Sequence, residues 1–255
     1  MSESAASVTR ALPPIMNMTG RKVLVTGAAR GIGAETARAF AQLGADLVIT
    51  DLRDIQQTVD DVTALGVNVT AVEGDLTDSA VVTALFEHGP FFSLAHVAGT
   101  AVWPKALTPD ERFELLMRVN VQATMLVASA AIEQMAEVGE GYVVLVGSLA
   151  GRSGGTVATT SLGHAAYTAS KGAVHSLVRW HARNATPRGV RVNGVAPGGV
   201  DTPMTQGKPF DENAFPLGRM GRADELGWSI ALLGTPVAGN TAGAILDVNG
   251  GVWVG

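Results

Sequence analysis

Short apolar runs alternate with amphipathic segments along most of the chain. Runs rich in β-branched residues, the pattern of strands covered on both faces, occur at 22–26, 46–50, 68–73, 91–95, 142–146, 190–196 and 244–248. Segments with helical periodicity lie between them, at 34–43, 55–65, 78–87, 109–138, from Tyr167 to about 185, and 224–233. Alternating strands and helices predict an α/β fold with a parallel sheet and right-handed crossovers. Ligands of such sheets bind at the carboxyl ends of the strands.

The longest predicted helix, 109–138, has a well-formed start. Thr108 is a capping residue, Pro109 occupies the first helical position, and Glu111 follows three residues after the cap. Apolar residues cover more than one face of this helix, which indicates burial beyond its own sheet. We therefore expect a homo-oligomer, a homotetramer or a homodimer.

Composition limits the class of protein. With 255 residues, 47% of them hydrophobic, the chain is expected to form one domain over residues 19–255, preceded by a flexible N-terminal arm at 1–18. A net charge of −5 without a basic cluster argues against nucleic acid as a partner. The absence of cysteine and of metal-binding histidine spacing argues against a metal site. No signal peptide or long apolar run is found, so we expect a cytoplasmic protein that does not bind a membrane.

A glycine turn follows the first predicted strand. Gly27, Gly31 and Gly33 lie between this strand and a helix, an arrangement that aims backbone N–H groups and the positive end of a helix dipole at a phosphate. Their spacing differs from the usual dinucleotide fingerprint, and a packing turn without a ligand remains an alternative.

Asp51 ends the second predicted strand, 18 residues beyond Gly33. A carboxylate in this position accepts both hydroxyls of an adenine ribose and repels a 2′-phosphate, which favours NAD over NADP. Arg30 and Arg53 are the counter-evidence, since either could pair with that phosphate. Asp75, after the third strand, either contacts an adenine edge or caps a helix.

Tyr167 and Lys171 are four residues apart, so on a helix they share one face. The reference pKa of tyrosine is about 10 and that of lysine about 10.4, so a nearby lysine charge favours the phenolate and suits the phenol to acid–base catalysis. An ordinary amphipathic helix turn is the alternative interpretation of this pair alone.

In order along the chain, these motifs resemble those of the short-chain dehydrogenase/reductase family over roughly residues 19 to 252. The matching residues are Thr26, Gly27, Gly31, Gly33, Asp75, Leu76, Ala98, Gly99, Asn120, Ser148, Tyr167, Lys171, Pro197, Gly198 and Thr202. The resemblance implies a doubly wound, three-layer Rossmann fold with seven parallel strands in the order 3-2-1-4-5-6-7. It also implies hydride transfer between a nicotinamide and a carbonyl or secondary alcohol carbon.

By the same resemblance, Tyr167 exchanges a proton with the substrate oxygen, and Ser148 hydrogen-bonds and orients that oxygen. Lys171 holds the nicotinamide ribose and lowers the pKa of Tyr167, while Asn120 positions a water in a proton relay to Lys171. The expected cofactor contacts are Gly27, Arg30, Gly31, Ile32, Gly33, Asp51, Asp75, Leu76, Ala98, Gly99, Tyr167, Lys171, Pro197, Gly198, Val200 and Thr202.

The chain departs from the family pattern in two informative places. His96 and Val97 occupy positions where the family has two asparagines, so the sheet contacts of those asparagines must be replaced or lost, and His96 is a candidate replacement. Ser148 and Tyr167 are 19 residues apart, several more than is typical, and the longer connection is expected to border the substrate pocket.

The loop 203–216 is predicted to be a lid.

The expected substrate pocket contains few charges. Its candidate residues are Trp103, Thr156, Val157, His164 and Met204. They predict a neutral, largely hydrophobic secondary alcohol or ketone, cyclic or aromatic in some cases. Alternatives are an NADP-dependent carbonyl or acyl-carrier reductase and, in another class, a dinucleotide-binding sensor without turnover.

Overall fold

The computed structural model describes residues 12–101, 105–155, 165–206 and 212–255. Its main sheet has seven strands in the order β3-β2-β1-β4-β5-β6-β9, and every neighbouring pair is parallel, which confirms the predicted fold and strand order. The strands are β1 (Lys22–Thr26), β2 (Asp46–Asp51), β3 (Val69–Glu73), β4 (Ser93–His96), β5 (Gly141–Val146), β6 (Val190–Pro197) and β9 (Ile245–Val248).

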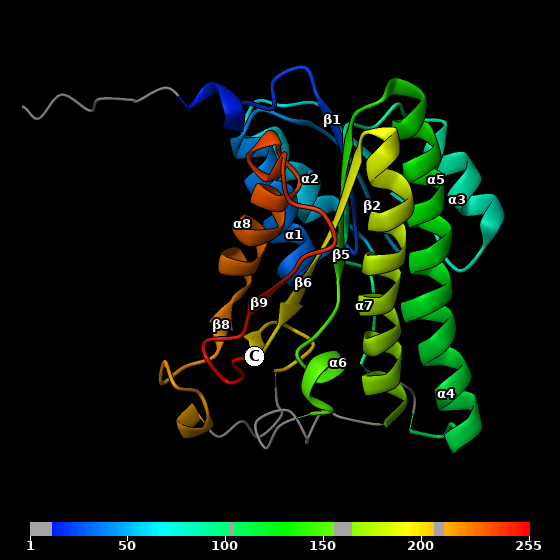
Figure 1. Cartoon of the computed structure of the whole chain (residues 1–255), viewed down its shortest axis with the longest axis vertical. Coiled ribbons are helices and arrows are strands. Elements are labelled where there is room, and N and C mark those ends of the chain that lie inside the picture. Colours follow the sequence, from blue (N-terminus) through cyan, green and yellow to red (C-terminus); the bar gives the residue numbers. More distant parts are fainter. Residues whose placement is uncertain (1–11, 102–104, 156–164, 207–211) are drawn as a thin grey trace, which may run out of the picture.

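Helices cover both faces of this sheet (Figure 1). On one face lie α1 (Gly31–Gln42), α2 (Gln56–Thr63) and α8 (Ala223–Leu233); on the other lie α3 (Ser79–Phe86), α4 (Pro109–Met117), α5 (Ala123–Val138) and α7 (Ala165–Ala185). Each face has its own hydrophobic cluster. Leu24 of β1 belongs to one cluster and its neighbour Val25 to the other, because successive side chains of a strand point to opposite faces. The fold therefore has three layers: helices, the sheet, and helices.

The predicted helix at 109–138 is interrupted. A π-helical turn, η2 (Arg118–Gln122), joins α4 to α5, and Asn120 lies buried within it. The predicted capping box at Thr108 and Glu111 is present. By length and composition the stretch Pro109–Val138 could cross a membrane, but Val127 and Met135 are fully buried against the sheet, as in a core helix of a soluble protein.

Several short elements were not predicted from the sequence. A two-stranded parallel sheet joins β7 (Val200–Asp201) to β8 (Gly221–Arg222), and a short helix, α6 (Ala150–Ser153), follows β5. The remaining turns are η1 (Pro14–Met16), η3 (Thr186–Arg188), η4 (Glu212–Ala214) and η5 (Pro236–Ala238). Because η4 lies in the loop 203–216, part of the predicted lid has local structure, whereas residues 207–211 lie outside the described residues.

The domain begins slightly before the predicted boundary at residue 19. Met18 is fully buried in the same hydrophobic cluster as Phe40, and its amide donates to the Leu43 carbonyl at 2.8 Å. The last part of the predicted arm is therefore packed against the domain. The rest of that prediction concerns residues 1–11, which lie outside the described residues.

Candidate active site

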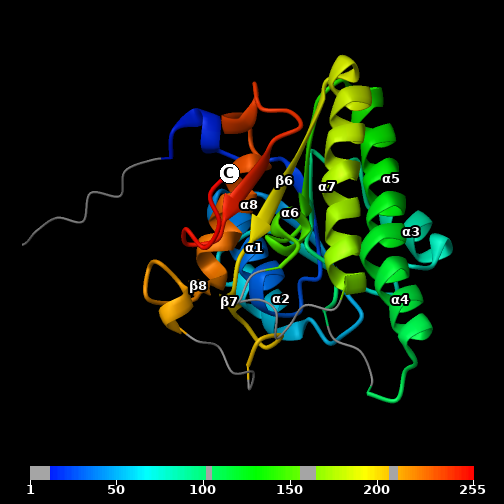
Figure 2. The same cartoon turned by 60° about the horizontal axis from the view of Figure 1, so that its bottom comes forward.

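The carboxyl ends of the central strands meet at one edge of the sheet, together with α6, β7 and β8 (Figure 2). Ser148 follows β5 at this edge, and Tyr167 lies in the first turn of α7. Their side chains interact, because the Ser148 hydroxyl lowers the pKa of the Tyr167 phenol, although the two residues are 19 apart in the sequence. Ser148 Oγ also accepts a hydrogen bond from the Ala150 amide at 3.1 Å, which fixes the serine rotamer. Two hydroxyl groups therefore converge on one point.

Burial controls the acidity of Tyr167. Removal of the phenol from solvent raises its pKa above the ordinary value of 10.0, and the hydrogen bond from Ser148 opposes this rise. We expected Lys171 to lower the pKa of Tyr167. In the protein without a bound cofactor, that expectation is wrong. The ammonium Nζ is 6.0 Å from the centroid of the tyrosine ring and donates instead to the Val146 carbonyl at 2.9 Å.

Lys171 is buried beside the tip of β5. Burial lowers its pKa from 10.5 to about 8, so the amine is still mostly protonated at neutral pH. A Cβ atom placed on Gly99 would lie 3.2 Å from Lys171 Nζ and 3.1 Å from Asn120 Oδ1. The lysine and the asparagine therefore approach the same glycine, as the predicted catalytic set requires.

The side chain of Asn120 is occupied by protein groups. Its Oδ1 accepts from the Thr100 amide at 2.8 Å, and its Nδ2 donates to the Thr100 carbonyl at 2.9 Å and to Ser170 Oγ at 3.0 Å. These contacts join the π-helical turn to the segment after β4 and to α7. The water relay through Asn120 stays a prediction.

The glycine turn has the features of an anion-binding helix start. Arg30 precedes α1 and its side chain does not cap the helix, and the first turn of α1 contains no acidic residue. No carboxylate therefore competes for the first amides of the helix, which include those of Gly31 and Ile32. Gly27 has a φ of +67° and Gly31 a φ of +59°, conformations that favour glycine. These features fit the diphosphate of a dinucleotide.

The turn also contacts other predicted cofactor residues. A Cβ on Gly27 would lie 2.8 Å from the Ala98 backbone, and one on Gly31 would lie 3.3 Å from Thr202 Cγ2. Gly198 follows Pro197, and its amide donates to the Val248 carbonyl at 3.1 Å. Val200 lies in β7, where its carbonyl accepts from Thr205 Oγ1 at 2.7 Å. The segments after β1, β4 and β6 are thus adjacent to one another.

Two carboxylates near the turn have different environments. The side chain of Asp51 is only 9% exposed; its Oδ2 accepts from the Ala29 amide at 3.1 Å, and its Oδ1 accepts from the Arg53 amide at 3.1 Å. Asp75 is exposed, and its Oδ1 accepts from the Thr77 amide at 2.9 Å. The helix-cap alternative for Asp75 is wrong, because α3 is capped by Asp78. Leu76 is buried in the core.

His96 connects β4 to β1. Its Nδ1 lies 3.0 Å from Thr26 Oγ1, which accepts in turn from the Ala98 amide at 3.1 Å. The imidazole therefore supplies a sheet contact at a position where the family has asparagine. Burial, and next the charge of Lys171, lowers the pKa of His96 from 6.5 to about 3, so the ring is neutral at physiological pH.

The predicted substrate pocket is only partly described. Trp103, Thr156, Val157 and His164 lie outside the described residues. Met204 follows β7 and is 39% exposed. His175, which was not among the predicted site residues, is buried and accepts a hydrogen bond from the Ser148 amide. Its spacing of four from Lys171 was the available signal in the sequence.

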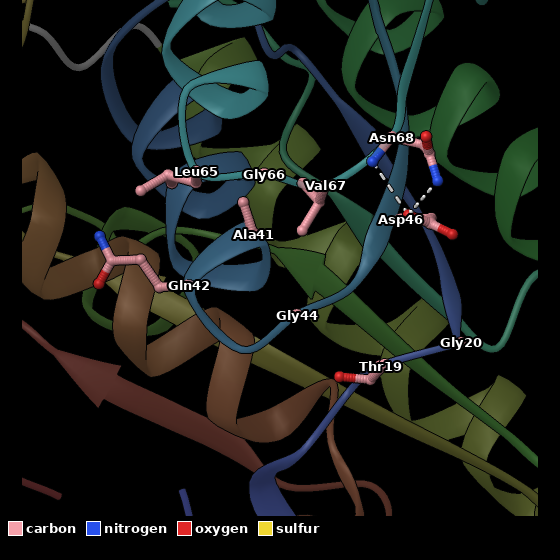
Figure 3. Close-up of a pocket in the computed structure, with 10 residues that line it drawn as sticks. All are labelled: Thr19, Gly20, Ala41, Gln42, Gly44, Asp46, Leu65, Gly66, Val67 and Asn68. Atoms are coloured by element: carbon pink, nitrogen blue, oxygen red, sulfur yellow. Dashed lines mark hydrogen bonds between the residues drawn. The ribbon is translucent and has the colours of Figure 1, made fainter. Parts of the chain in front are cut away.

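A cavity of about 750 Å³ lies away from the catalytic residues, near the amino ends of β2 and β3 (Figure 3). Its lining includes Thr19, Gln42 and Asp46, and the Asp46 carboxylate is bonded to Asn68 at 3.0 Å. None of the predicted catalytic or cofactor residues lines it, so its size does not indicate the site of chemistry.

Comparisons with known proteins identify the family of the chain. The family model described as short chain dehydrogenase matches residues 21–213. The galactitol 2-dehydrogenase (L-tagatose-forming) of Cereibacter sphaeroides is 36% identical over 94% of this chain and 98% of its own. The cis-4-hydroxycyclohexanecarboxylate dehydrogenase of Sinomonas cyclohexanicum is 35% identical over 91% and 96%.

Among solved structures, a putative 2-deoxy-D-gluconate 3-dehydrogenase from Agrobacterium tumefaciens with bound NADP has a TM-score of 0.82 and 27% identity, covering 94% of this chain and 99% of its own. The fold, the converging hydroxyl groups and these similarities lead to one conclusion. The chain belongs to the short-chain dehydrogenase/reductase family and is an oxidoreductase acting on CH–OH groups.

Proposed function

We propose that the protein is an NAD-dependent oxidoreductase that interconverts a secondary alcohol and a ketone on a neutral, largely hydrophobic small molecule. The observation that carries this proposal is the interaction of the Ser148 hydroxyl with the Tyr167 phenol, with Lys171 one helical turn further along α7. Two hydroxyl groups at one point suit a single substrate oxygen, whose negative charge changes as hydride moves.

The chain's own residues supply binding and proton transfer, whereas a nicotinamide dinucleotide supplies the hydride acceptor or donor when bound. The amides of Gly31 and Ile32 would hold its diphosphate, and Lys171 would hold the nicotinamide ribose. In oxidation, Tyr167 accepts the proton of the substrate hydroxyl; in reduction it donates one to the substrate oxygen. Ser148 donates a hydrogen bond to that oxygen in both directions.

The direct test replaces Tyr167 by phenylalanine. We expect Tyr167→Phe to lower kcat by a factor on the order of 10² to 10⁴, because general acid–base catalysis is lost, and to leave NADH affinity within about twofold. The chain contains only one other tyrosine, Tyr142, which is buried in β5 away from this edge. Tyr142→Phe is the matched control and should retain kcat. Equal turnover by both variants would remove Tyr167 from the mechanism.

The environment of Asp51 supports NAD. Its carboxylate is held toward the glycine turn by the Ala29 amide, and the exposed Arg53 is 3.7 Å away from the same carboxylate. Bringing a 2′-phosphate against this fixed charge is unfavourable, whereas ribose hydroxyls donate to it. Two observations favour an NADP-dependent reductase as the second candidate: Arg30 is exposed and could pair with a 2′-phosphate, and the similar Agrobacterium structure contains bound NADP.

The ratio of kcat/KM for NAD to that for NADP distinguishes the two. We expect the wild type to favour NAD, and Asp51→Ala to lower the ratio by about 10-fold or more, since a charge repulsion is removed. Glu73→Ala removes an exposed carboxylate at the register position next to Asp51 on β3 and should leave the ratio unchanged. A wild-type preference for NADP would refute the assignment.

The pairing of Arg152 supports an uncharged substrate. Arg152 lies in α6, four residues after Ser148, but its guanidinium is directed to β9, where Nε is 2.8 Å from Asp247 Oδ1 and Nη2 donates to the Ile245 carbonyl. This cation is therefore already neutralised. Cyclohexanol, galactitol and cis-4-hydroxycyclohexanecarboxylate, tested with NAD, separate the classes. We expect cyclohexanol to give the largest kcat/KM, and turnover of the carboxylate alone would contradict the proposal.

The outer helices support a homotetramer or homodimer. Phe113 of α4, Met125 of α5 and Trp180 of α7 are 50%, 45% and 62% exposed, on helices that cover the same face of the sheet (Figures 1 and 2). Large apolar side chains on one layer suit an interface between copies. Sedimentation equilibrium at micromolar concentration should give a mass of two or four chains, and Trp180→Asp should shift it toward one. Cell fractionation should find the protein in the cytoplasm.

A further inference from the structure

Three successive amides hold the tip of β5, where Ser148 lies. The Gly147 amide donates to the Val195 carbonyl at 2.8 Å, and the Leu149 amide donates to the Pro197 carbonyl at 2.8 Å. Both bonds join the tip to β6. The Ser148 amide points to the other side and donates to His175 Nε2 of α7 at 3.4 Å. A side chain therefore provides the helix-side anchor of the serine.

The structure makes room for this imidazole at one glycine. A Cβ on Gly147 would lie 2.2 Å from His175 Nε2 and 2.4 Å from its Cδ2, so the ring packs directly on the backbone of the strand tip. His175 is only 3% exposed. Because the contact is close and buried, the position of the ring and the position of the Ser148 backbone depend on each other.

The same face of α7 carries the other two predicted catalytic groups. Tyr167, Lys171 and His175 follow one another at intervals of four residues, which places them along one side of the helix. Tyr167 contributes its hydroxyl directly, while His175 accepts from the backbone amide of Ser148, whose hydroxyl interacts with the phenol. One rigid helix thus sets the relative position of both oxygens.

We propose that His175 is a positioning residue: its neutral Nε2 accepts the Ser148 amide and holds Ser148 Oγ in the orientation that pairs with Tyr167. This inference rests on the proposed oxidoreductase function. It assigns to this chain a second helix-borne contact that aligns the catalytic hydroxyl groups without touching the substrate.

The surroundings keep this imidazole neutral. Burial, and next the positive charges of Arg152, Arg179 and Lys171, lowers its pKa from 6.5 to about 4. Arg152 approaches from α6 and is paired with Asp247 of β9, while Arg179 and Lys171 lie on α7. Neutral imidazole that accepts through Nε2 carries its proton on Nδ1. The acceptor is therefore available throughout the neutral and alkaline range.

Four variants separate positioning from simple packing. His175→Val removes the acceptor, and His175→Gln places an amide oxygen near the position of Nε2. His181→Val and His181→Gln are matched controls, since His181 is a second buried histidine of α7, nearly three turns from Lys171, and in the described part of the chain it makes no hydrogen bond to Ser148. Should His175→Val not fold, His175→Asn takes its place, because its shorter side chain does not reach the amide.

Three quantities are measured for each variant: kcat with cyclohexanol and NAD, the Kd for NADH, and the hydrogen exchange rate of the Ser148 amide. We expect His175→Val to lower kcat by about 10-fold or more, because a partly buried donor loses its partner and the hydroxyl loses its alignment. Its Kd for NADH should change by less than about twofold. Exchange at Ser148 should accelerate, and His175→Gln should restore most of both effects.

The inference is overturned if kcat of His175→Val equals that of His181→Val, if NADH binding falls as much as kcat, or if glutamine restores nothing. Tyr167→Phe, run in parallel, keeps this failure distinct from failure of the proposed function. If Tyr167→Phe and the wild type turn over equally, the proposed reaction is wrong. Independently of the reaction, an unchanged hydrogen exchange rate of the Ser148 amide in His175→Val would reject the anchoring contact.

Discussion

Replacement of Gly33 by alanine should damage the cofactor site more than any change of charge there. A Cβ at this position would lie 1.9 Å from the Gly27 carbonyl oxygen and 2.6 Å from its carbon, both backbone atoms. To reach the 3.4 Å of an ordinary contact, the turn and the start of α1 must separate by about 1.5 Å. Such overpacking costs about 1–3 kcal/mol of the free energy of unfolding.

The same displacement moves the first amides of α1, which we expect to bind the diphosphate. NADH affinity should therefore fall by about 10-fold or more, equal to about 1.4 kcal/mol. Gly172→Ala is the matched control, because among the described residues a Cβ there meets only the Gly151 carbonyl oxygen, at 3.7 Å. This control lies inside α7 and should gain about 1 kcal/mol from helix propensity.

Fluorescence titration with NADH and thermal unfolding measure the two effects. For a chain of this length, a loss of about 2 kcal/mol lowers Tm by about 4–8 °C, and the control should raise it by about 2–4 °C. If Gly33→Ala bound NADH within twofold of the wild type and unfolded at the same temperature, the tight packing of the turn against α1 would be refuted.

Three further outcomes follow from individual contacts. Ser148→Ala removes the hydrogen bond that lowers the pKa of Tyr167, so the pH profile of alcohol oxidation should move to higher pH and kcat should fall by about 100-fold; an unshifted profile would contradict this. The pKa values of His96 and His175 are lowered to about 3 and about 4, so the unfolded chain binds protons first below pH 6.5. Urea unfolding should accordingly show a loss of about 2 kcal/mol per histidine between about pH 7 and pH 5, and His175→Gln should flatten this slope. Thr108→Ala removes the capping box of α4 and should cost about 1 kcal/mol in the same assay, with no effect on kcat.

The strands and most helices could be predicted because their signals are local. A buried parallel strand such as Val190–Pro197 is a continuous apolar run, and Thr108 with Glu111 marks a helix start wherever it occurs. The π-helical turn at Arg118–Gln122 has no such signal. Its periodicity is hidden within a long apolar helix, and Asn120 is stabilised there by partners 20 and 50 residues away.

The pKa of Tyr167 shows a second limit of sequence reasoning. The spacing of Tyr167 and Lys171 correctly places both on α7, but it says nothing about burial or about competing acceptors. In the folded chain, burial raises the pKa of the phenol, and the Lys171 ammonium donates its hydrogen bond to the Val146 carbonyl. This hydrogen bond joins α7 to the end of β5, and no local sequence pattern connects the two elements. Tertiary contacts therefore decide the electrostatics of a site whose members the sequence identifies.

The long connection between Ser148 and Tyr167, which we expect to border the substrate pocket, lies outside the elements that carry the catalytic pair. Gly151 of α6 packs directly on α7, where a Cβ would lie 2.6 Å from the Lys171 carbonyl carbon. The chain is thus joined to α7 on both sides of the catalytic pair: by α6 after Ser148 and by His175 beneath it. Ser148 follows β5 and Tyr167 lies on α7, so we expect changes between Gly155 and Ala165 to leave these contacts in place. Changes in that segment should therefore alter the KM for the alcohol while the Ser148–Tyr167 pair, and with it the proton transfer, is preserved.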